Sequence, residues 1–226
     1  MRLRARPEGV AAAYADAGRP AGRTAWREAR WCALDLELTG LDPDKDEIVA
    51  IGAVPIEHGR LILADSMYTL VRSSRRSDHD AVLMHKLRVA DLTDAPPLER
   101  AAEMVMEVLA GRVPVFHTGW VETSFLAPLF SAAHLRFPAA ADTELVGRLF
   151  LHFRDGIAPA RLSLAGLSEL LGQSGEAPHH ALADALTTAQ AFIALATKLE
   201  AFEPQTVASL TGAGKRLGGG RRFGPI

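Results

Sequence analysis

Short apolar segments occur in this chain in an order that restricts its fold more than any other feature of the sequence. Three predicted strands follow one another, and they cover residues 31–36, 47–56 and 61–71. The second and third are joined by a hairpin turn at His58-Gly59. Further strands, over residues 113–118 and just before Asp142, alternate with predicted helices. This order predicts an α/β fold whose sheet has an antiparallel part and a parallel part.

Most of the remaining chain is predicted to be helical. The expected helices cover residues 10–17, 80–88, 98–109, 121–134, 143–151, 163–171 and 181–200. In the third of these, apolar residues recur at helical spacing up to Leu109, and Gly111 is placed to end the helix. Asp142 reads as the N-cap of the helix that follows it.

The distribution of charge divides the chain into three parts. Residues 1–30 hold seven arginines against three acids, and residues 211–226 hold four basic residues and no acid. The middle, residues 31–210, has 14 basic and 24 acidic residues and so a charge of −10. We therefore expect a basic N-terminal extension, one globular domain and a disordered, glycine-rich basic tail. An acidic domain binds nucleic acid poorly unless cations offset its charge, so a divalent metal is worth looking for.

Several classes of protein are not expected from this composition. No apolar run is long enough to span a membrane, and no apolar segment of a secretory signal follows the basic N-terminus. The single cysteine, Cys32, lies in an apolar strand and reads as a buried core residue. These features predict a cytoplasmic protein without a membrane partner.

The first candidate site is Asp35-Leu36-Glu37 at the end of the first strand. Residues i and i+2 of a strand point to the same face, so the two carboxylates lie close together. Such paired oxygen ligands suit Mg²⁺ or Mn²⁺. The alternative is that both side chains face solvent at the end of a strand.

Two later segments add candidate residues. Glu122 follows the strand that contains His117 and is expected in the first turn of a helix, where the helix dipole alone would favour it. His179 and His180 precede the last long helix, and Asp184 lies one turn into it. An imidazole titrates near neutrality, as a general base requires, although histidines in a loop can simply face solvent.

Taken together, these segments resemble the three motifs of the DEDDh 3′→5′ exonuclease superfamily, which includes the proofreading subunit of bacterial replicative DNA polymerases. The resemblance covers about residues 31–197. It favours His179 over His180, because the family's histidine stands five residues before the aspartate. The second motif departs from the usual His-Asn-Ala-x-Phe-Asp: Thr118 stands in place of asparagine and Glu122 in place of aspartate.

The resemblance implies a ribonuclease-H-like three-layer fold, with a mixed five-stranded sheet flanked by helices. It further implies that Asp35, Glu37 and Asp184 ligate one Mg²⁺ or Mn²⁺ ion. Asp35 would bridge to a second ion, and Glu122 would complete that site directly or through water. His179 would take the proton of the attacking water, and a nucleoside 5′-monophosphate would leave from a nucleic-acid 3′ end.

Substrate contacts are expected beside these ligands. The candidate substrate-binding residues are Leu38, Thr39, Gly40, Leu41 and Thr118. Leu38 stands where the first motif commonly has threonine, and the Thr39–Leu41 segment would cradle the terminal nucleotide, the alternative being a plain turn. His85 would line the site or lie on a helix surface. The basic tail would add weak, salt-sensitive affinity for DNA or RNA, the alternative being a solvated, disordered tail without a ligand.

Two other functions remain open from the sequence. One is a catalytically weak or inactive module that binds nucleic acid or a protein partner such as a polymerase; Glu122 and Thr118 support it. The other is an enzyme of the same metal chemistry that acts on mononucleotides or another phosphodiester.

Overall fold

A single mixed sheet forms the centre of the protein, whose computed structural model describes residues 6–73, 75, 86–173 and 179–218. Within these ranges the sheet has six strands: β1 (Trp31–Leu38), β2 (Ile48–Glu57), β3 (Arg60–Leu61), β4 (Met67–Leu70), β5 (Val113–Phe116) and β6 (Ala141–Asp142). Their order is β3-β2-β1-β5-β6, and β4 also pairs with β2. Strands β1, β5 and β6 are parallel, whereas β2 is antiparallel to β1, β3 and β4. The predicted mixed α/β sheet is confirmed.

The predicted number of five strands is wrong, because the third predicted strand is broken in two. β3 pairs with the end of β2 and β4 with its middle, and the short 3-10 helix η1 (Leu63–Asp65) lies between them. Pro55 of β2 accepts a hydrogen bond from the backbone of Ile62 but has no N–H to donate in return. The ladder is interrupted there, and the intervening residues leave the sheet with Leu63 exposed.

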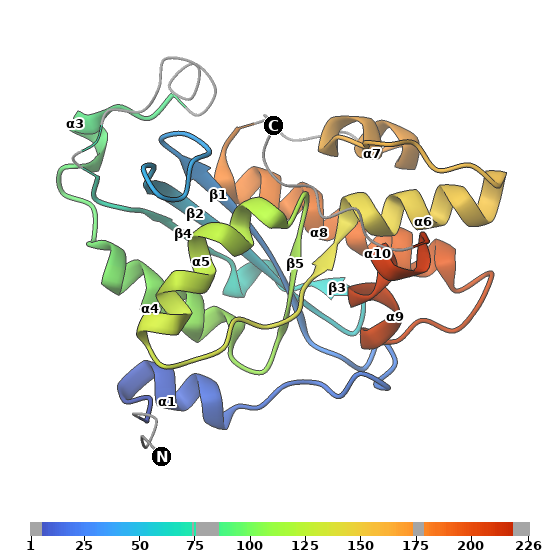
Figure 1. Cartoon of the computed structure of the whole chain (residues 1–226), viewed down its shortest axis with the longest axis horizontal. Coiled ribbons are helices and arrows are strands. Elements are labelled where there is room, and N and C mark those ends of the chain that lie inside the picture. Colours follow the sequence, from blue (N-terminus) through green and yellow to red (C-terminus); the bar gives the residue numbers. More distant parts are fainter. Residues whose placement is uncertain (1–5, 74, 76–85, 174–178, 219–226) are drawn as a thin grey trace.

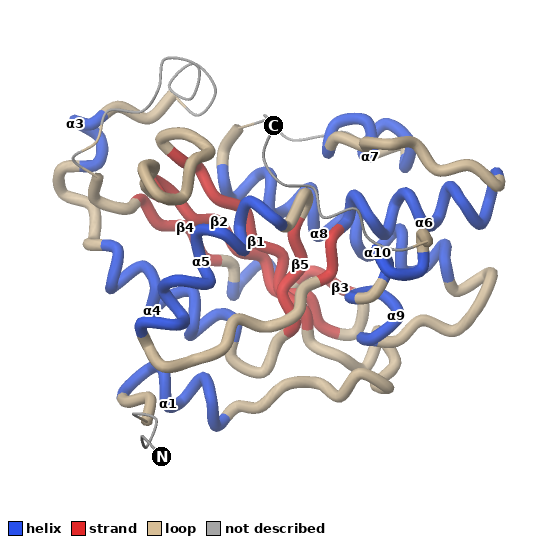
Figure 2. The backbone as a smooth tube through the Cα atoms, viewed as in Figure 1, coloured by secondary structure: helices blue, strands red, loops and turns tan. Residues whose placement is uncertain are grey.

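Helices cover both faces of the sheet and make three layers (Figures 1 and 2). The helices of one face are α1 (Gly9–Asp16), α4 (Leu98–Leu109) and α5 (Trp120–Ala132). Those of the other are α6 (Thr143–Asp155), α7 (Leu164–Leu171), α8 (Ala181–Leu199), α9 (Val207–Thr211) and α10 (Ala213–Arg216). Alternate residues of β1 serve the two cores: Cys32 and Leu34 pack toward α4, and Trp31 and Ala33 toward α8.

Most predicted helices are present with small changes at their ends. The helix over residues 98–109 is α4, and Gly111 after it has a positive φ of 70°. Helix α6 continues four residues past its predicted end, because it stops only where Gly156 takes the left-handed conformation. The helix expected at residues 80–88 lies largely outside the described residues, as does His85; α3 (Val89–Leu92) follows it. Among the described helices, none has the length and apolar character needed to cross a membrane.

Both basic ends of the chain contribute to the packed structure. Trp26 is buried and donates a hydrogen bond from its indole nitrogen to Glu200 at the end of α8. The backbone of residues 22–26 bonds to residues 205–208. The tail was expected to be disordered from residue 211, yet α10 is helical and Ala213 in it is buried. The last eight residues lie outside the described part, and the division of the chain at residues 30 and 211 stays a prediction.

Gly52 of β2 allows α8 to approach the sheet closely. A Cβ atom at this position would stand 2.2 Å from the backbone oxygen of Ala181, the first residue of α8. Gly52 is also the partner of Asp35 in the sheet register. Helix α8 therefore begins over β2, next to Asp35 of β1, the first residue of the first predicted motif.

Replacing Gly52 with alanine is expected to destabilise the protein by about 3 kcal/mol or more, because backbone atoms must move to make room for the methyl group. Urea denaturation followed by circular dichroism measures the loss. A Gly18→Ala variant is the control for loss of a glycine, since open space surrounds the Cβ position there and only its positive φ opposes the change. Equal stability of Gly52→Ala and wild type would contradict the close contact.

Candidate active site

The carboxyl ends of two parallel strands meet where β1 and β5 lie side by side. Asp35 and Glu37 project from the end of β1 on the face that α8 covers, because they share the parity of Trp31 and Ala33. Asp184 lies in the first turn of α8, which begins over β2 at Gly52. Three carboxylates from two distant parts of the chain are thereby brought to one place.

These three carboxylates form a compact group. One carboxylate oxygen of each of Asp35, Glu37 and Asp184 lies within 4.8 Å of the others. Asp184 is fixed from both sides, since its backbone N–H bonds to the carbonyl of His180 and its Oδ2 accepts the backbone N–H of His179 at 2.8 Å. The structure thus brings together the three carboxylates that were predicted to share a site.

Burial and neighbouring charges make ionisation of these three carboxyl groups unfavourable. Burial, and then the charges of Glu122, Asp184 and Glu37, raise the pKa of Asp35 well above its usual value. Burial and the charge of Asp184 raise the pKa of Glu37 to about 7. The pKa of Asp184 is raised as well, mainly by burial. Neighbouring carboxylates thus disfavour the ionised forms of Asp35 and Glu37, and burial disfavours that of Asp184.

Glu122 stands beside this group and adds to its charge. It lies in the first turn of α5, as the sequence predicted, and is 4% exposed. Burial, and to a smaller degree the charge of Asp142, raise the pKa of Glu122 well above its usual value. Its Oε2 atom is buried and has no hydrogen-bond partner in the described part of the protein. An acid placed here only for the helix dipole would face solvent, so this burial indicates another role.

Asp142 holds the turn that carries Glu122. It caps α6 as predicted, accepting the backbone N–H of Glu144 at 2.9 Å. The same carboxylate also accepts the backbone N–H groups of Thr118 and Gly119, which lead into α5. This second contact was not predicted from the sequence, because it depends on the pairing of Asp142 with Phe116 in the neighbouring strand.

The two histidines before α8 are exposed and have different surroundings. His179 has a positive φ of 65°, which is unusual for a residue with a side chain, and its backbone N–H is the one bound to Asp184. The ring of His180 stacks on Tyr68, with 4.7 Å between ring centroids and an angle of 20°. A ring held against an aromatic neighbour is poorly placed to receive a proton elsewhere, which agrees with the choice of His179.

The predicted substrate residues fall into two groups. Leu38 packs in the core and Thr39 is fully buried, whereas Leu41 is 62% exposed. Thr118 has a positive φ of 61° and donates from its hydroxyl to Glu144. Gly40 is partly exposed between Thr39 and Leu41. Contact with a substrate stays a prediction for all of them, and Leu41 has the side chain best exposed for it.

A divalent cation suits this arrangement of oxygen atoms. The donors are carboxylates only, three of them share one small volume, and the buried Oε2 of Glu122 adds an unused acceptor. Hard cations such as Mg²⁺ and Mn²⁺ prefer such ligands. A cation also lowers the pKa of each raised carboxyl group, so binding and deprotonation favour each other.

The fold and the acidic group together define the ribonuclease-H-like class of α/β proteins. The sequence profile of the RNase_T exonuclease family matches residues 32–192. The chain therefore belongs to this exonuclease family, within the DEDDh 3′→5′ exonuclease superfamily that its motifs resemble.

Two curated relatives and one solved structure illustrate the similarity. The chain is 28% identical over 172 residues to DNA polymerase III PolC-type of Thermotoga petrophila, a match of 75% of this chain and 12% of that protein. It is 31% identical over 173 residues to a DNA polymerase III subunit epsilon-like protein of Rhodobacter capsulatus, covering 74% of this chain and 24% of the relative. The chain thus spans a quarter or less of both. The structure of E. coli exonuclease I in complex with a dT13 oligonucleotide matches with a TM-score of 0.65 at 13% identity, covering 77% and 42% of the two chains.

Addition of Mg²⁺ is expected to raise the melting temperature more at about pH 8 than at about pH 5.5. The folded-state pKa of Glu37 is raised from 4.5 to about 7, so in the metal-free protein its contribution to stability is present below pH 4.5 and lost as the pH rises through 7. A cation binds the ionised form and removes this loss. The Mg²⁺-induced increase should therefore be larger at the higher pH by about 5 °C, measured by differential scanning fluorimetry.

The difference between melts with and without Mg²⁺ is needed because His117 acts in the opposite direction. Burial lowers the pKa of His117 to about 4, so its contribution to stability is present above pH 6.5 and lost as the pH falls through 4. That contribution cancels when melts at one pH are compared. An Asp35→Asn variant should lose the Mg²⁺ effect, and an equal effect at both values of pH would contradict a site made of these carboxylates.

Proposed function

We propose that this chain is a metal-dependent 3′→5′ exonuclease that hydrolyses phosphodiester bonds at nucleic-acid 3′ ends and releases nucleoside 5′-monophosphates. The observation that carries the proposal is the group of Asp35, Glu37 and Asp184 within 4.8 Å, with raised pKa values and buried Glu122 beside it. Like-charged carboxylates kept this close destabilise the fold unless a cation binds between them, so a role in cation binding accounts for their arrangement.

Each side chain has a separate part in this proposal. Asp35, Glu37 and Asp184 would hold one cation, and Asp35 and Glu122 would provide ligands for a second. Two bound Mg²⁺ or Mn²⁺ ions would supply Lewis acidity for the attacking water and for the leaving 3′-oxygen. His179, exposed and next to Asp184, accepts the proton of the water.

The partners proposed for this site are a nucleic-acid 3′ end and a polymerase or another protein. The dT13 oligonucleotide bound to E. coli exonuclease I supports the first, and the polymerase names of the curated relatives support the second. Leu41, exposed on the turn after β1, would contact the terminal base. We place this activity in the cytoplasm.

A non-catalytic module that binds nucleic acid or a protein is the second candidate function. The observation in its favour is the Thr118 hydroxyl, which donates to Glu144 within the protein and so is not free for a substrate end. Glu122, one methylene longer than the usual aspartate of the second motif, points the same way.

The test is to incubate the protein with 5′-labelled and 3′-labelled single-stranded DNA and RNA, in the presence of Mg²⁺, Mn²⁺ or EDTA. A 5′ label should report a ladder of shortened products, and a 3′ label should be released as a mononucleotide at once. EDTA should stop both. Intact oligonucleotide with both metals, together with measurable binding, would reject the enzyme and support the binding module.

A further inference from the structure

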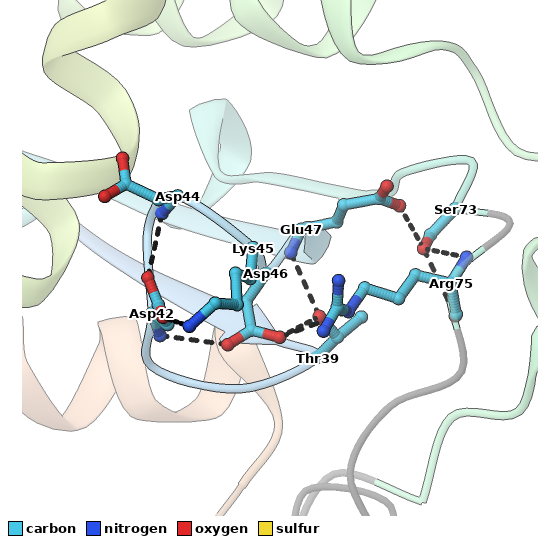
Figure 3. A network of polar contacts seen from close by, with 8 residues as sticks. All are labelled: Thr39, Asp42, Asp44, Lys45, Asp46, Glu47, Ser73 and Arg75. Atoms are coloured by element: carbon cyan, nitrogen blue, oxygen red, sulfur yellow. Dashed lines mark hydrogen bonds and ion pairs between the residues drawn. The ribbon is translucent and has the colours of Figure 1, made fainter.

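The turn between β1 and β2 is organised around the carboxylate of Asp46 (Figure 3). This side chain is 6% exposed and accepts hydrogen bonds from the Thr39 hydroxyl at 3.0 Å and the Asp42 backbone N–H at 2.9 Å. It also forms an ion pair with Arg75 at 3.3 Å. One carboxylate thus joins the first residue of the turn, its middle and a segment beyond β4.

The hydroxyl and the backbone N–H of Thr39 are both used in hydrogen bonds within this turn. Its hydroxyl donates to Asp46 and accepts the backbone N–H of Glu47 at 3.0 Å, and its own backbone N–H bonds to the carbonyl of Glu47. The residue is fully buried. Its side chain therefore has no donor left for a nucleotide, and the predicted cradle is reduced to the backbone of Gly40 and the exposed side chain of Leu41.

Gly40 fits under Asp46 only because it lacks a side chain. A Cβ atom at residue 40 would stand 2.5 Å from Oδ2 of Asp46 and 2.8 Å from Oδ1. The carboxylate cannot move away without losing its bonds to Thr39 and Asp42. The path of the backbone just before Leu41 is therefore fixed by the position of Asp46.

The far side of the turn is held as well. The hydroxyl of Ser73, a buried residue after β4, donates to Oε2 of Glu47 at 2.5 Å. Together with the Asp46–Arg75 pair, this contact ties the turn to the segment that follows β4. The turn is thus anchored at both ends, while Leu41 at its outer part remains apolar and 62% exposed.

We propose that Asp46 is a positioning residue for substrate binding: it holds Gly40 and Leu41 in the conformation that contacts the 3′-terminal nucleotide. The inference rests on the proposed function and deepens it, because it names the residue that shapes the nucleotide-contacting turn. Asp46 lies outside the carboxylate group of Asp35, Glu37 and Asp184. It acts on affinity for the substrate and leaves the chemical step to that group.

The experiment compares Asp46→Asn with Asp44→Asn. Both changes remove one negative charge from the same turn, but the carboxylate of Asp44 points away from the network (Figure 3). An asparagine at residue 46 keeps one acceptor oxygen and loses the second, so it cannot serve both Thr39 and Asp42. Asp46→Asn should raise KM for a 5′-labelled oligothymidylate about tenfold with kcat nearly unchanged, whereas Asp44→Asn should resemble wild type.

Variants at Leu41 and Gly40 keep the test decisive if Asp46→Asn is poorly folded. Leu41→Ala removes an exposed side chain and should raise KM without lowering the melting temperature, and Leu41→Met should restore most of the affinity. Gly40→Ala should raise KM by itself and add little in the double variant with Asp46→Ala, because loss of the carboxylate makes room for the methyl group. Fully multiplicative effects of Gly40→Ala and Asp46→Ala would overturn the inference.

Binding measured by fluorescence anisotropy in EDTA separates this inference from the proposed function. If wild type shortens no oligonucleotide, the proposed nuclease activity fails. Weaker binding of a free 3′ end by Asp46→Asn than by Asp44→Asn would still support a positioning role. Equal affinities of the two variants, or a loss confined to kcat, would overturn that role whether or not the chain is a nuclease.

Discussion

Replacing Asp35 with asparagine should abolish metal-dependent shortening of oligonucleotides and leave the metal-free fold at least as stable as before. Burial raises the pKa of Asp35 most, and the charges of Glu122, Asp184 and Glu37 raise it further. The amide removes the charge on which the proposed cations depend. A loss of several kcal/mol of transition-state stabilisation corresponds to a rate lower by about a thousandfold or more.

The stability result distinguishes loss of a cation site from loss of structure. An asparagine at residue 35 carries no charge and so does not repel the remaining carboxylates. The melting temperature in EDTA at about pH 8 should therefore be equal to or higher than that of wild type. Asp44→Asn, in an exposed part of the turn, is the matched control and should keep full activity. Residual activity within tenfold of wild type would reject Asp35 as a ligand, and a large drop in melting temperature would make the lost activity uninformative about ligation.

The second large effect is expected at His179. Replacing it with alanine should lower kcat by a factor of about 10² to 10⁴, the usual contribution of a general base. The same change at His180 should alter kcat less than threefold. Its ring stacks on Tyr68, so its loss should cost about 1 kcal/mol of stability and little activity.

The Mg²⁺-induced rise in melting temperature is the control for both histidine variants. The hydrogen bond that His179 gives to Asp184 comes from its backbone, so His179→Ala retains it. The Mg²⁺-induced rise in melting temperature should therefore be the same in both variants and in wild type. If His180→Ala is the slower enzyme, the assignment of the base is wrong. If His179→Ala loses the Mg²⁺ effect, its role lies in holding Asp184.

Local pattern was sufficient to predict the acidic strand. Alternation in β1 places Asp35 and Glu37 on one face, and the structure confirms this because both share the parity of Trp31 and Ala33. The approach of Asp184 could not be obtained in this way. It depends on α8 crossing the sheet at Gly52, a contact between residues more than a hundred positions apart, and only the resemblance to a family indicated it.

Other features lay beyond prediction because they depend on neighbours in space. Asp142 accepts hydrogen bonds from the turn before Glu122 because β6 pairs with β5. The burial of Thr39 follows from a turn whose acceptor, Asp46, stands seven residues later. The break between β3 and β4 had visible signals in Pro55 and in the polar pair Asp65-Ser66, but the strand prediction continued through that pair.

Composition gave no indication of how the first thirty residues pack. Arginine, alanine and glycine dominate there, and the structure buries Tyr14 against Phe130 and Trp26 beside Phe192. The residues that anchor this segment to the core are single aromatic side chains among polar neighbours. Their partners lie in α5 and α8, so no local pattern could identify them.

The pairing of residues 22–26 with residues 205–208 has a practical consequence for any attempt to isolate or transplant this domain. The part that matches the family ends at residue 192, yet Trp26, Val207 and Ala213 belong to the same core as β1 and α8. A fragment trimmed to the matching residues would expose that core and lose the indole bond of Trp26 to Glu200. Tyr14 of α1 is buried in the core on the other face of the sheet, so the smallest transferable unit extends from about residue 9, where α1 begins, to residue 216, where α10 ends.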